Sequence, residues 1–338
     1  MKTLNKIKES DILATLKGAG GGYISGQAIS ERLGVSRTAI WKHIGALRKA
    51  GYAVEGHPKK GYRLTAPVER PFNALEITLD IPTEFTGKEV LFFEELESTN
   101  SKASELARAG AAEGTVVIAQ AQSKGRGRMA RSWYSPAGVN VYTSVILRPK
   151  LPPQATRTIT LACAVALAEA IEDTTGAAPS LKWPNDVLIN GKKVAGILTE
   201  MSSESDRVNH IIIGIGINVN IEAADLPDGL RYPASSLKQE TGRLTDRAEL
   251  CRNLYSRLEK WYKVLLSEGS EEVVETWKER FTFVGKEVRI EGYRGIGAEP
   301  SVTEGICLGI DSEGALLIKE RSGAIERVVA GDMAQSPG

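Results

Sequence analysis

The first 64 residues carry short helical patterns separated by glycines. Apolar side chains recur at intervals of four and three, at Ile40, Ile44 and Leu47. This spacing predicts a helix with one buried stripe, and Ser36 stands where that helix needs an N-cap. Helical patterns also cover residues 5–17 and residues 25–33. Gly34 closes the second of these, and a Gly-Val turn joins it to the helix that begins after Ser36. The pattern predicts a helix-turn-helix.

A polar segment with two glycines follows the last of these helices. Residues 51–64 resemble the hairpin wing of winged helix-turn-helix proteins. Pro67 and Pro71 then discourage continuation of a strand or a helix. We therefore predict an N-terminal winged helix-turn-helix domain over residues 1–66.

The central region mixes strand and helix patterns. Strands are predicted over 89–94, 115–121, 140–147, 197–201 and 209–215, helices over 100–109, 158–174, 246–266 and 270–280, and a helix or turn over 75–80. Asn190-Gly191 predicts a hairpin over residues 187–194. Because several strands are joined by hairpins, the pattern favours an α+β domain over residues 67–282 rather than a doubly wound parallel sheet.

The remaining residues, 283–338, contain short β-prone runs. They cover 287–291, 302–308, 315–319 and 325–329, with Gly and Asp or Ser turns between them. This pattern predicts a small β-barrel. The whole chain is thus an α+β multidomain protein, and its 338 residues are enough for two or three domains.

Composition indicates a cytoplasmic protein without membrane contact. Hydrophobic residues make up 42% and charged residues 25% of the chain, as in globular proteins. No apolar run approaches the roughly 18 residues that span a membrane, and the charged N-terminus lacks the apolar stretch of a signal peptide. The cysteines are few and far apart, so they predict neither a disulfide framework nor a zinc site.

The net charge of +1 hides an uneven distribution. Residues 1–64 contain 12 Lys and Arg against 4 Asp and Glu, and the remainder contains 31 against 38. A basic head on an acidic body predicts a nucleic-acid-binding module. One such module reads few base pairs, so useful specificity implies a homodimer on a two-fold site.

The DNA-binding hypothesis assigns residues to two elements. The helix that begins after Ser36 enters a major groove, with Arg37 and Thr38 near base edges and Lys42 on the same exposed face. At the tip of the wing, lysines contact phosphates; these are Lys59 and Lys60. The alternative is a small helical domain that only packs on its neighbour.

The residue inventory excludes several kinds of active site. The chain has three histidines, and His43 and His57 lie in the N-terminal module, so a Ser-His-Asp triad or a histidine zinc site is not expected. There is no P-loop pattern, and residues 214–218 lack the third glycine of a dinucleotide fingerprint. We assign no metal to direct protein ligands.

A basic loop and a polar turn carry the candidate chemistry. Between Lys124 and Trp133 there are three arginines, no acid and two glycines. Guanidinium groups suit phosphate oxygens, and the glycines let the backbone approach a ligand closely. A solvated basic loop is the alternative. A site of Arg, Lys, Asn and Gly without a nucleophile suits acyl-adenylate formation, in which positioning and charge neutralisation do most of the catalysis.

Five ordered segments resemble those of biotin–protein ligases. They are Ser98-Thr-Asn100, Gly125-Arg-Gly-Arg128 with Trp133, Lys182-Trp-Pro-Asn-Asp186, Lys193-Val-Ala-Gly196 and Gly214-Ile-Gly-Ile-Asn218. The resemblance spans roughly the whole chain and extends to ligases that are also biotin operon repressors. It implies a class II synthetase-like central domain and an SH3-like C-terminal domain.

The resemblance also implies roles for single residues. Lys193 and Arg128 would be catalytic, with Lys193 at the biotin carboxylate and the α-phosphate of ATP. The biotin site would comprise Ser98, Thr99, Asn100, Gln122, Gly125, Arg126, Arg128, Lys193, Gly196 and Gly214. The ATP site would comprise Arg128, Arg131, Trp133, Lys182 and Asn185. Asp186 has two interpretations, a contact to Mg²⁺ and a turn residue, of which we favour the turn. Lys192 is expected to be a surface lysine. Met129-Ala130 departs from the family, in which many members carry an arginine and a glycine there.

The implied reaction uses ATP and Mg²⁺ to make biotinyl-5′-AMP from biotin. Biotin then passes to a lysine of the biotin carboxyl carrier domain of acetyl-CoA carboxylase, and of other biotin-dependent carboxylases where they exist. Accumulated adenylate would favour a homodimer on operator DNA. Three alternatives stay open: a transcription regulator with a sensor-only ligase domain, a lipoate-attaching ligase, and a ligase without DNA regulation.

Overall fold

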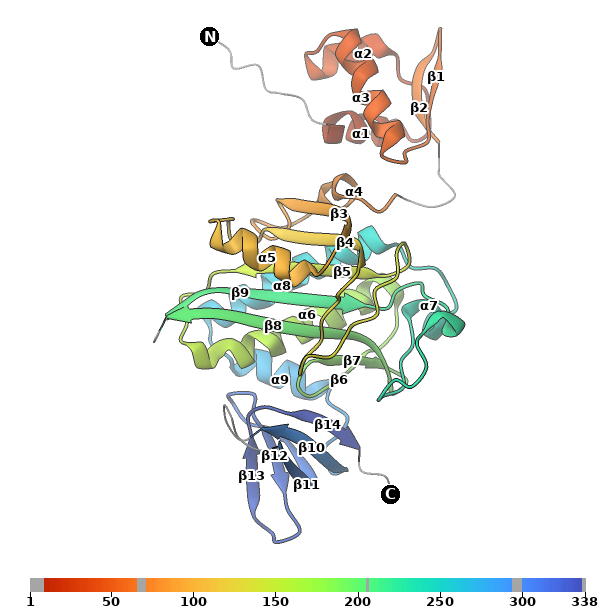
Figure 1. The fold of residues 1–338 in the computed structure, drawn as a ribbon. Helices are drawn as coiled ribbons and strands as arrows, with labels where there is room; N and C mark the ends of the chain where they lie inside the picture. The colour runs from red at the N-terminus through yellow and green to blue at the C-terminus, as the bar shows by residue number, and fades with distance from the viewer. Residues whose placement is uncertain (1–8, 66–70, 205–206, 294–299, 336–338) are drawn as a thin grey trace. The chain divides into compact units, whose positions relative to one another are not determined.

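The computed structural model describes residues 9–65, 71–204, 207–293 and 300–335. Contacts between residues divide the chain into two compact units, Met1–Asp80 and Ile81–Gly338. Within the described ranges, no helix is both long enough and apolar enough to cross a membrane. Figure 1 labels the elements of both units.

The first unit is a helix-turn-helix followed by a hairpin. Its elements are α1 (Glu9–Gly18), α2 (Gly26–Leu33), α3 (Arg37–Lys49), β1 (Val54–His57), β2 (Gly61–Leu64) and α4 (Ala74–Thr78). Ser25 and Ser36 cap α2 and α3 by accepting backbone N–H groups, and Gly34 ends α2 in the left-handed conformation. These caps are the local reason for the predicted turn, and the winged helix-turn-helix prediction is confirmed.

The core of this unit comes from the stripe seen in the sequence. Ile40, Ile44 and Leu47 of α3 are fully buried against α1 and α2. The wing lies close to the strand-like segment before α2, because a Cβ atom on Gly61 would stand 2.2 Å from the Ile24 carbonyl oxygen. Gly61 also has a φ of +97°, so glycine is required there for two reasons.

Helix α4 packs on the first unit. Glu76 is buried at its centre, where it accepts a hydrogen bond from the Tyr52 hydroxyl at 2.9 Å and pairs with Lys17 at 2.8 Å. Apolar residues of α4 and its end, Leu75 and Leu79, join the same core. The residues after the proline-rich linker therefore return to the N-terminal core before the second unit begins.

The second unit contains a seven-stranded mixed sheet in the order β3-β4-β5-β9-β8-β7-β6. The strands are β3 (Val90–Leu96), β4 (Val116–Gln122), β5 (Val141–Leu147), β6 (Ser180–Lys182), β7 (Asp186–Ile189), β8 (Lys192–Glu204) and β9 (Arg207–Ile217). β3 and β4 pair in parallel and all other pairs are antiparallel. The predicted α+β class is confirmed.

Helices cover both faces of this sheet (Figure 1). α5 (Thr99–Arg108) packs on one face, where Val117, Ile146 and Ile212 meet its alanines. α6 (Thr156–Thr175) packs on the strands and against α8 (Arg247–Ser267) and α9 (Glu271–Glu279). Because α6 has the sheet on one side and helices on the other, its middle, residues 161–168, is apolar and buried all round, and Cys163 lies within it.

The C-terminal residues form a five-stranded antiparallel sheet in the order β13-β12-β11-β10-β14. Its strands are β10 (Glu287–Tyr293), β11 (Pro300–Ile310), β12 (Leu316–Lys319), β13 (Ile325–Val328) and β14 (Asp332–Gln335). The β-rich tail is confirmed, while the SH3-like closure of this sheet stays a prediction. Three short elements escaped the sequence patterns: β6, β14 and α7 (Leu237–Thr241).

Candidate functional site

A pocket opens on the α5 face of the seven-stranded sheet, and glycines form its floor. Gly196 pairs with Gly216 across β8 and β9, and Leu198 pairs with Gly214. A Cβ atom on Gly214 would stand 2.0 Å from Asn100 Oδ1, and one on Gly216 would stand 2.5 Å from the Trp133 ring. Side chains can lie directly on these strands only because the strands carry no side chain there.

One end of the pocket is a neutral hydrogen-bond network at the start of α5. Ser98 caps the helix. Thr99 donates its backbone N–H to Gln122 Oε1 at 2.8 Å. Ser144 donates from Oγ and lies 2.8 Å from Thr99 Oγ1 and 2.7 Å from Asn100 Oδ1. Gln122 in turn donates to Ser135 at 3.0 Å. The network fixes the orientation of both amide side chains.

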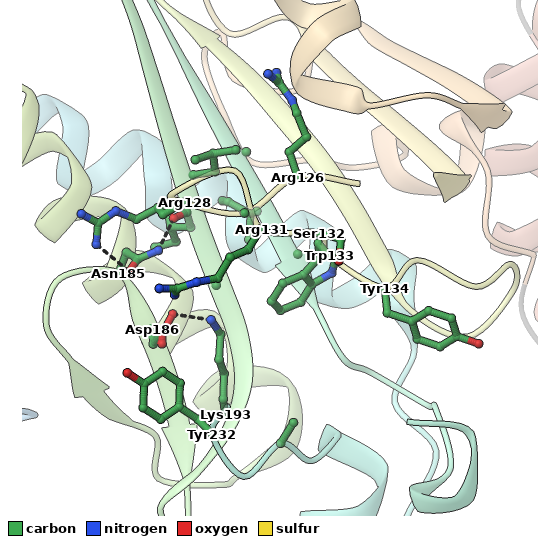
Figure 2. A pocket seen from close by; sticks show the side chains of 18 of the residues that line it. Arg126, Arg128, Arg131, Ser132, Trp133, Tyr134, Asn185, Asp186, Lys193 and Tyr232 are labelled. Atoms are coloured by element: carbon green, nitrogen blue, oxygen red, sulfur yellow. Dashed lines mark hydrogen bonds and ion pairs between the residues drawn. The ribbon is translucent and has the colours of Figure 1, made fainter. Parts of the chain in front are cut away.

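The other end of the pocket is charged. Lys193 Nζ lies 2.6 Å from Asp186 Oδ1, as the dashed line in Figure 2 marks, and 5.3 Å from the centre of the Trp133 ring. Lys182 Nζ lies 3.9 Å from Asp186 Oδ2 and 3.4 Å from the centre of the Tyr232 ring. One carboxylate therefore stands between two lysines that come from β6 and β8.

The pKa of Lys182 is lowered to about 8, chiefly by burial; Asp186 opposes this shift and the charge of Lys193 contributes to it. The aromatic face of Tyr232 offers the ammonium group a cation–π contact in place of water. Lys182 thus changes charge near neutral pH, unlike a lysine in water.

The arginines of the loop separate into two directions in Figure 2. Arg128 donates to the Gly331 carbonyl oxygen at 2.9 Å and lies 3.5 Å from both Asn185 Oδ1 and Asp332 Oδ1. Arg131 also pairs with Asp332. Burial lowers the pKa of Arg128, and the adjacent carboxylate opposes this shift. Arg126 points the other way, toward Glu200, at 2.9 Å.

The tip of this loop has an unusual backbone. Met129 and Ala130 both have positive φ, at 54° and 57°. Two successive non-glycine residues in the left-handed region cost about 1–2 kcal/mol each. These are the positions at which the sequence departs from the family pattern, so the departure places a side chain where the backbone favours glycine.

The structure brings nearly all the predicted ligand residues to this pocket. Its lining includes Ser98, Thr99, Asn100, Gln122, Arg126, Arg128, Arg131, Trp133, Lys182, Asn185, Lys193, Gly196 and Gly214. Gly125 is not part of the described lining and lies behind it, where a Cβ atom would stand 2.4 Å from the Trp133 carbonyl oxygen. Lys192 lies outside the pocket as expected and pairs with Glu240.

Sequence reasoning missed several lining residues. Asp186 was expected in a turn, but it is the first residue of β7 and is buried between the two lysines. Asp332 arrives from the C-terminal sheet, and Arg231 and Tyr232 arrive from the segment before α7. The Pro-Asn-Asp sequence signalled only the turn. No sequence motif marks the other three residues, which lie far from the recognised segments.

The first unit presents a separate basic face. Arg37, Thr38 and Lys42 are exposed on α3, and Ser36 is its exposed N-cap. Trp41, on the same helix, has 69% of its surface exposed. Lys59 and Lys60 are exposed in the turn between β1 and β2, where both backbone N–H groups donate to His57 Nδ1. All six predicted DNA contacts are therefore accessible.

Fold and site together define a ligase-like domain that carries a helix-turn-helix unit. Residues 92–218 match the model of the biotin/lipoate A/B protein ligase family, residues 8–63 match an HTH domain, and residues 283–334 match the biotin protein ligase C-terminal domain.

Individual relatives agree with these matches. The bifunctional ligase/repressor BirA of Bacillus subtilis is 43% identical over 96% of this chain and 97% of its own length. The Escherichia coli protein of that name is 32% identical over 93% of this chain and 94% of its own length. A biotin protein ligase from Aquifex aeolicus, solved with biotin and ATP, covers 74% of this chain and 100% of its own, at 29% identity and a TM-score of 0.63. The chain belongs to the biotin protein ligase family.

Proposed function

We propose that this protein is an ATP-dependent biotin–protein ligase that makes biotinyl-5′-AMP and transfers biotin to a lysine of a carboxylase carrier domain. The observation that carries the proposal is the division of one pocket into a neutral end and a cationic end. A polar, uncharged ring system fits the network around Asn100 and Gln122, and a carboxylate and a triphosphate fit the lysines and arginines opposite.

The adenylation step joins two anions, so charge must be neutralised at the point where they meet. Lys193 belongs to the charged end, and its ammonium group lies 2.6 Å from Asp186. We assign Lys193 to the biotin carboxylate and the α-phosphate, and Arg128 to the negative charge that develops on the oxygens of the α-phosphate. The carboxylate oxygen attacks the α-phosphorus, the bond to the bridging oxygen breaks, and pyrophosphate leaves.

The nucleotide would extend from Lys193 toward the C-terminal sheet. Arg131, Lys182 and Asn185 line that direction and suit the phosphates, and Trp133 offers its indole face to adenine. Mg²⁺ would enter with the phosphates. Asp186 is the carboxylate nearest to both lysines, and it would hold them rather than serve as the main ligand of the metal ion.

In the second step the amine of a target lysine attacks the acyl carbon of the mixed anhydride, and AMP leaves. Water would compete with that amine. We assign the loop from Gly125 to Arg131 to the role of a cover that orders over the bound adenylate and shields the anhydride. The carrier domain of acetyl-CoA carboxylase is the proposed acceptor, because relatives from Paracoccus denitrificans and Mycobacterium tuberculosis are named biotin–[acetyl-CoA-carboxylase] ligases.

The test is incubation of the purified protein with ATP, Mg²⁺, biotin and an apo carrier domain, scored by mass spectrometry of the carrier. We expect a mass gain of one biotinyl group, and loss of that gain in Lys193→Ala. Lipoate in place of biotin should give none. A protein that binds biotin but modifies no carrier would instead be a sensor.

We also propose that the protein represses biotin genes as a homodimer on operator DNA. The exposed α3 face and the lysines of the wing turn support DNA contact. Biotinyl-5′-AMP would raise operator affinity if it binds the dimer more tightly than the monomer, because linkage then couples the two equilibria.

Operator binding can be measured by fluorescence anisotropy, with ATP and biotin present or absent. Arg37→Ala should weaken operator binding by about 1–3 kcal/mol and reduce the preference for the operator over other sequences. Lys59→Ala should weaken binding to all DNA sequences alike, and it should reduce the slope of log affinity against log salt concentration by about 1. Adenylate that leaves both dimerisation and DNA affinity unchanged would indicate a ligase without DNA regulation.

A further inference from the structure

A carboxylate outside the described pocket lining links its neutral end to the basic loop. Glu200 lies on β8, two residues beyond Leu198 on the face that α5 covers. Its Oε2 atom accepts from Asn100 Nδ2 at 2.7 Å and from Arg126 Nη2 at 2.9 Å. A single oxygen atom thus joins an amide of the network to a guanidinium of the loop.

The contact determines which way the Asn100 amide faces. Asn100 Oδ1 accepts from Ser144 at 2.7 Å, and its Nδ2 donates to the Leu198 carbonyl oxygen at 3.3 Å as well as to Glu200. If the amide were reversed, Nδ2 would face the Ser144 hydroxyl, and Oδ1 would face two acceptors, the Leu198 carbonyl oxygen and the Glu200 carboxylate. The carboxylate contact is charge-assisted and short, so it is the stronger of the two donor contacts.

The same carboxylate ties down the start of the basic loop. Arg126 is 44% exposed and Glu200 is 37% exposed, so water can replace this ion pair at low cost. Arg128 and Arg131 are tied to a different carboxylate, Asp332. The loop is therefore attached at one end to the sheet that forms the neutral network and at the other to the C-terminal sheet.

We propose that Glu200 is a positioning residue that couples occupation of the biotin pocket to closure of the basic loop. Glu200 Oε2 contacts both Asn100 and Arg126. A ligand that fixes the Asn100 side chain therefore also fixes Glu200, and a fixed Glu200 favours the closed position of the basic loop. This inference rests on the proposed function, because it takes biotin as the ligand next to Asn100.

Two substitutions separate the two contacts of Glu200. Glu200→Gln keeps an acceptor for Asn100 and removes the charge that holds Arg126. We expect biotin Kd within about twofold of wild type and adenylate release faster by about 2–5-fold, the range that an exposed ion pair supports. Glu200→Ala removes both contacts, and we expect biotin Kd to rise about tenfold or more, because a charge-assisted hydrogen bond is lost as well.

The coupling is tested by a double-mutant cycle with Arg126→Gln. Adenylate release should be no faster in the double variant than in Arg126→Gln alone, since Arg126→Gln already removes the ion pair that Glu200→Gln removes. KM for ATP should stay within about twofold throughout. The matched control is Glu204→Gln, on the same strand, whose carboxylate accepts from Asn209 at 3.2 Å. It should match wild type in every measurement.

Isothermal titration gives the biotin Kd, and release of radiolabelled adenylate into excess unlabelled ligand gives its dissociation rate. The proposal would be overturned if Glu200→Ala had the biotin Kd and the adenylate dissociation rate of the wild type. It would also be overturned if the two single substitutions multiplied in their effects on the dissociation rate of the double variant. A variant counts as folded if its thermal unfolding midpoint is close to that of the wild type. If Glu200→Ala does not fold, Glu200→Gln supplies the test. Wild-type protein that neither binds biotin nor forms adenylate would instead refute the proposed function itself.

Discussion

The two ends of the pocket hold their polar groups by different means. At the neutral end Thr99 donates to Gln122, Gln122 donates to Ser135, and Ser144 donates to Thr99 and Asn100, so donors and acceptors are matched inside the protein. At the charged end Lys193 and Arg131 are held by carboxylates that a bound anion can replace or share. The neutral end is rigid before any ligand arrives, while the charged end is arranged to exchange partners.

This difference follows from the cost of burying each kind of group. An amide or hydroxyl that is buried without a partner costs about 1–3 kcal/mol, and hydrogen bonds within the network offset this cost without any ligand. A cluster of cations repels itself, and it can be kept near a buried site only if acids are interleaved. Asp186 and Asp332 serve that purpose here, because Asp186 pairs with two lysines and Asp332 with three arginines.

The largest effect should come from Lys193 at the charged end, which we assign to both reactants. Lys193→Ala should lower the rate of adenylate formation by about 10²–10³-fold, because it removes a cation aimed at charge that develops during the reaction. Pyrophosphate release assayed with biotin and ATP measures the rate. Lys192→Ala, which removes a pair with Glu240 outside the described pocket lining, should stay close to the wild-type rate. A similar loss in both variants would place the effect in the hairpin rather than in the ammonium group.

The rigid end should be sensitive to a single methyl group. Gly214→Ala would place a Cβ atom 2.0 Å from Asn100 Oδ1, so the amide must move. Overpacking costs about 1–3 kcal/mol, which corresponds to biotin Kd higher by about 5–100-fold. KM for ATP should change far less. Ile213→Val, directed to the opposite face of the same strand and outside the described pocket lining, is the control and should leave biotin Kd unchanged in a titration.

The charged end alone should respond to pH. The pKa of Lys182 is lowered to about 8 by burial, so the side chain is charged below that pH and loses its charge as pH rises through it. A phosphate contact is then lost, and kcat/KM for ATP should fall by about tenfold from pH 7.5 to 9.5. Lys182→Arg stays charged and should flatten the profile. Biotin affinity measured without ATP should show no matching fall.

The smallest effect should come from the loop that joins the ends. Ala130 has a φ of 57°, so Ala130→Gly should relieve strain. Glycine also increases the conformational entropy of the unfolded chain, which offsets part of this gain. We therefore expect the free energy of unfolding to rise by about 0.5–1 kcal/mol. Urea denaturation measures it. Ala112→Gly, at an exposed alanine outside the left-handed region, should lower stability instead, and equal changes in both would argue against strain at the loop.

Local patterns were sufficient wherever neighbours in sequence supply the physical constraint. Ser36 as an N-cap and Gly34 as a helix end were predicted correctly, because a cap needs only the next few residues. The strands and long helices of the central domain also followed from periodicity. The short strand β14 did not, because its sequence Asp-Met-Ala-Gln contains no β-branched or aromatic residue.

The sequence predicted the pocket residues that belong to recognised motifs. Asn100, Arg128 and Lys193 line it as expected, although their roles toward biotin and ATP await the experiments above. Asp186 was misplaced because Pro-Asn-Asp is a common turn signal, while the strand that starts there is set by its pairing with β6 and β8. Glu200 was missed because one acidic residue in a strand carries no pattern.

By itself the sequence determined the order of the domains, the helix-turn-helix, the α+β class and the family. These depend on spacing, caps and ordered motifs, which are properties of consecutive residues. Only the tertiary structure decided that Asp332 meets Arg131, and that Glu200 joins Asn100 to Arg126. Such pairs are separated by about 75 to 200 residues. Sheet register and helix packing bring them together, and no local rule of charge or periodicity encodes which distant carboxylate a given arginine will meet.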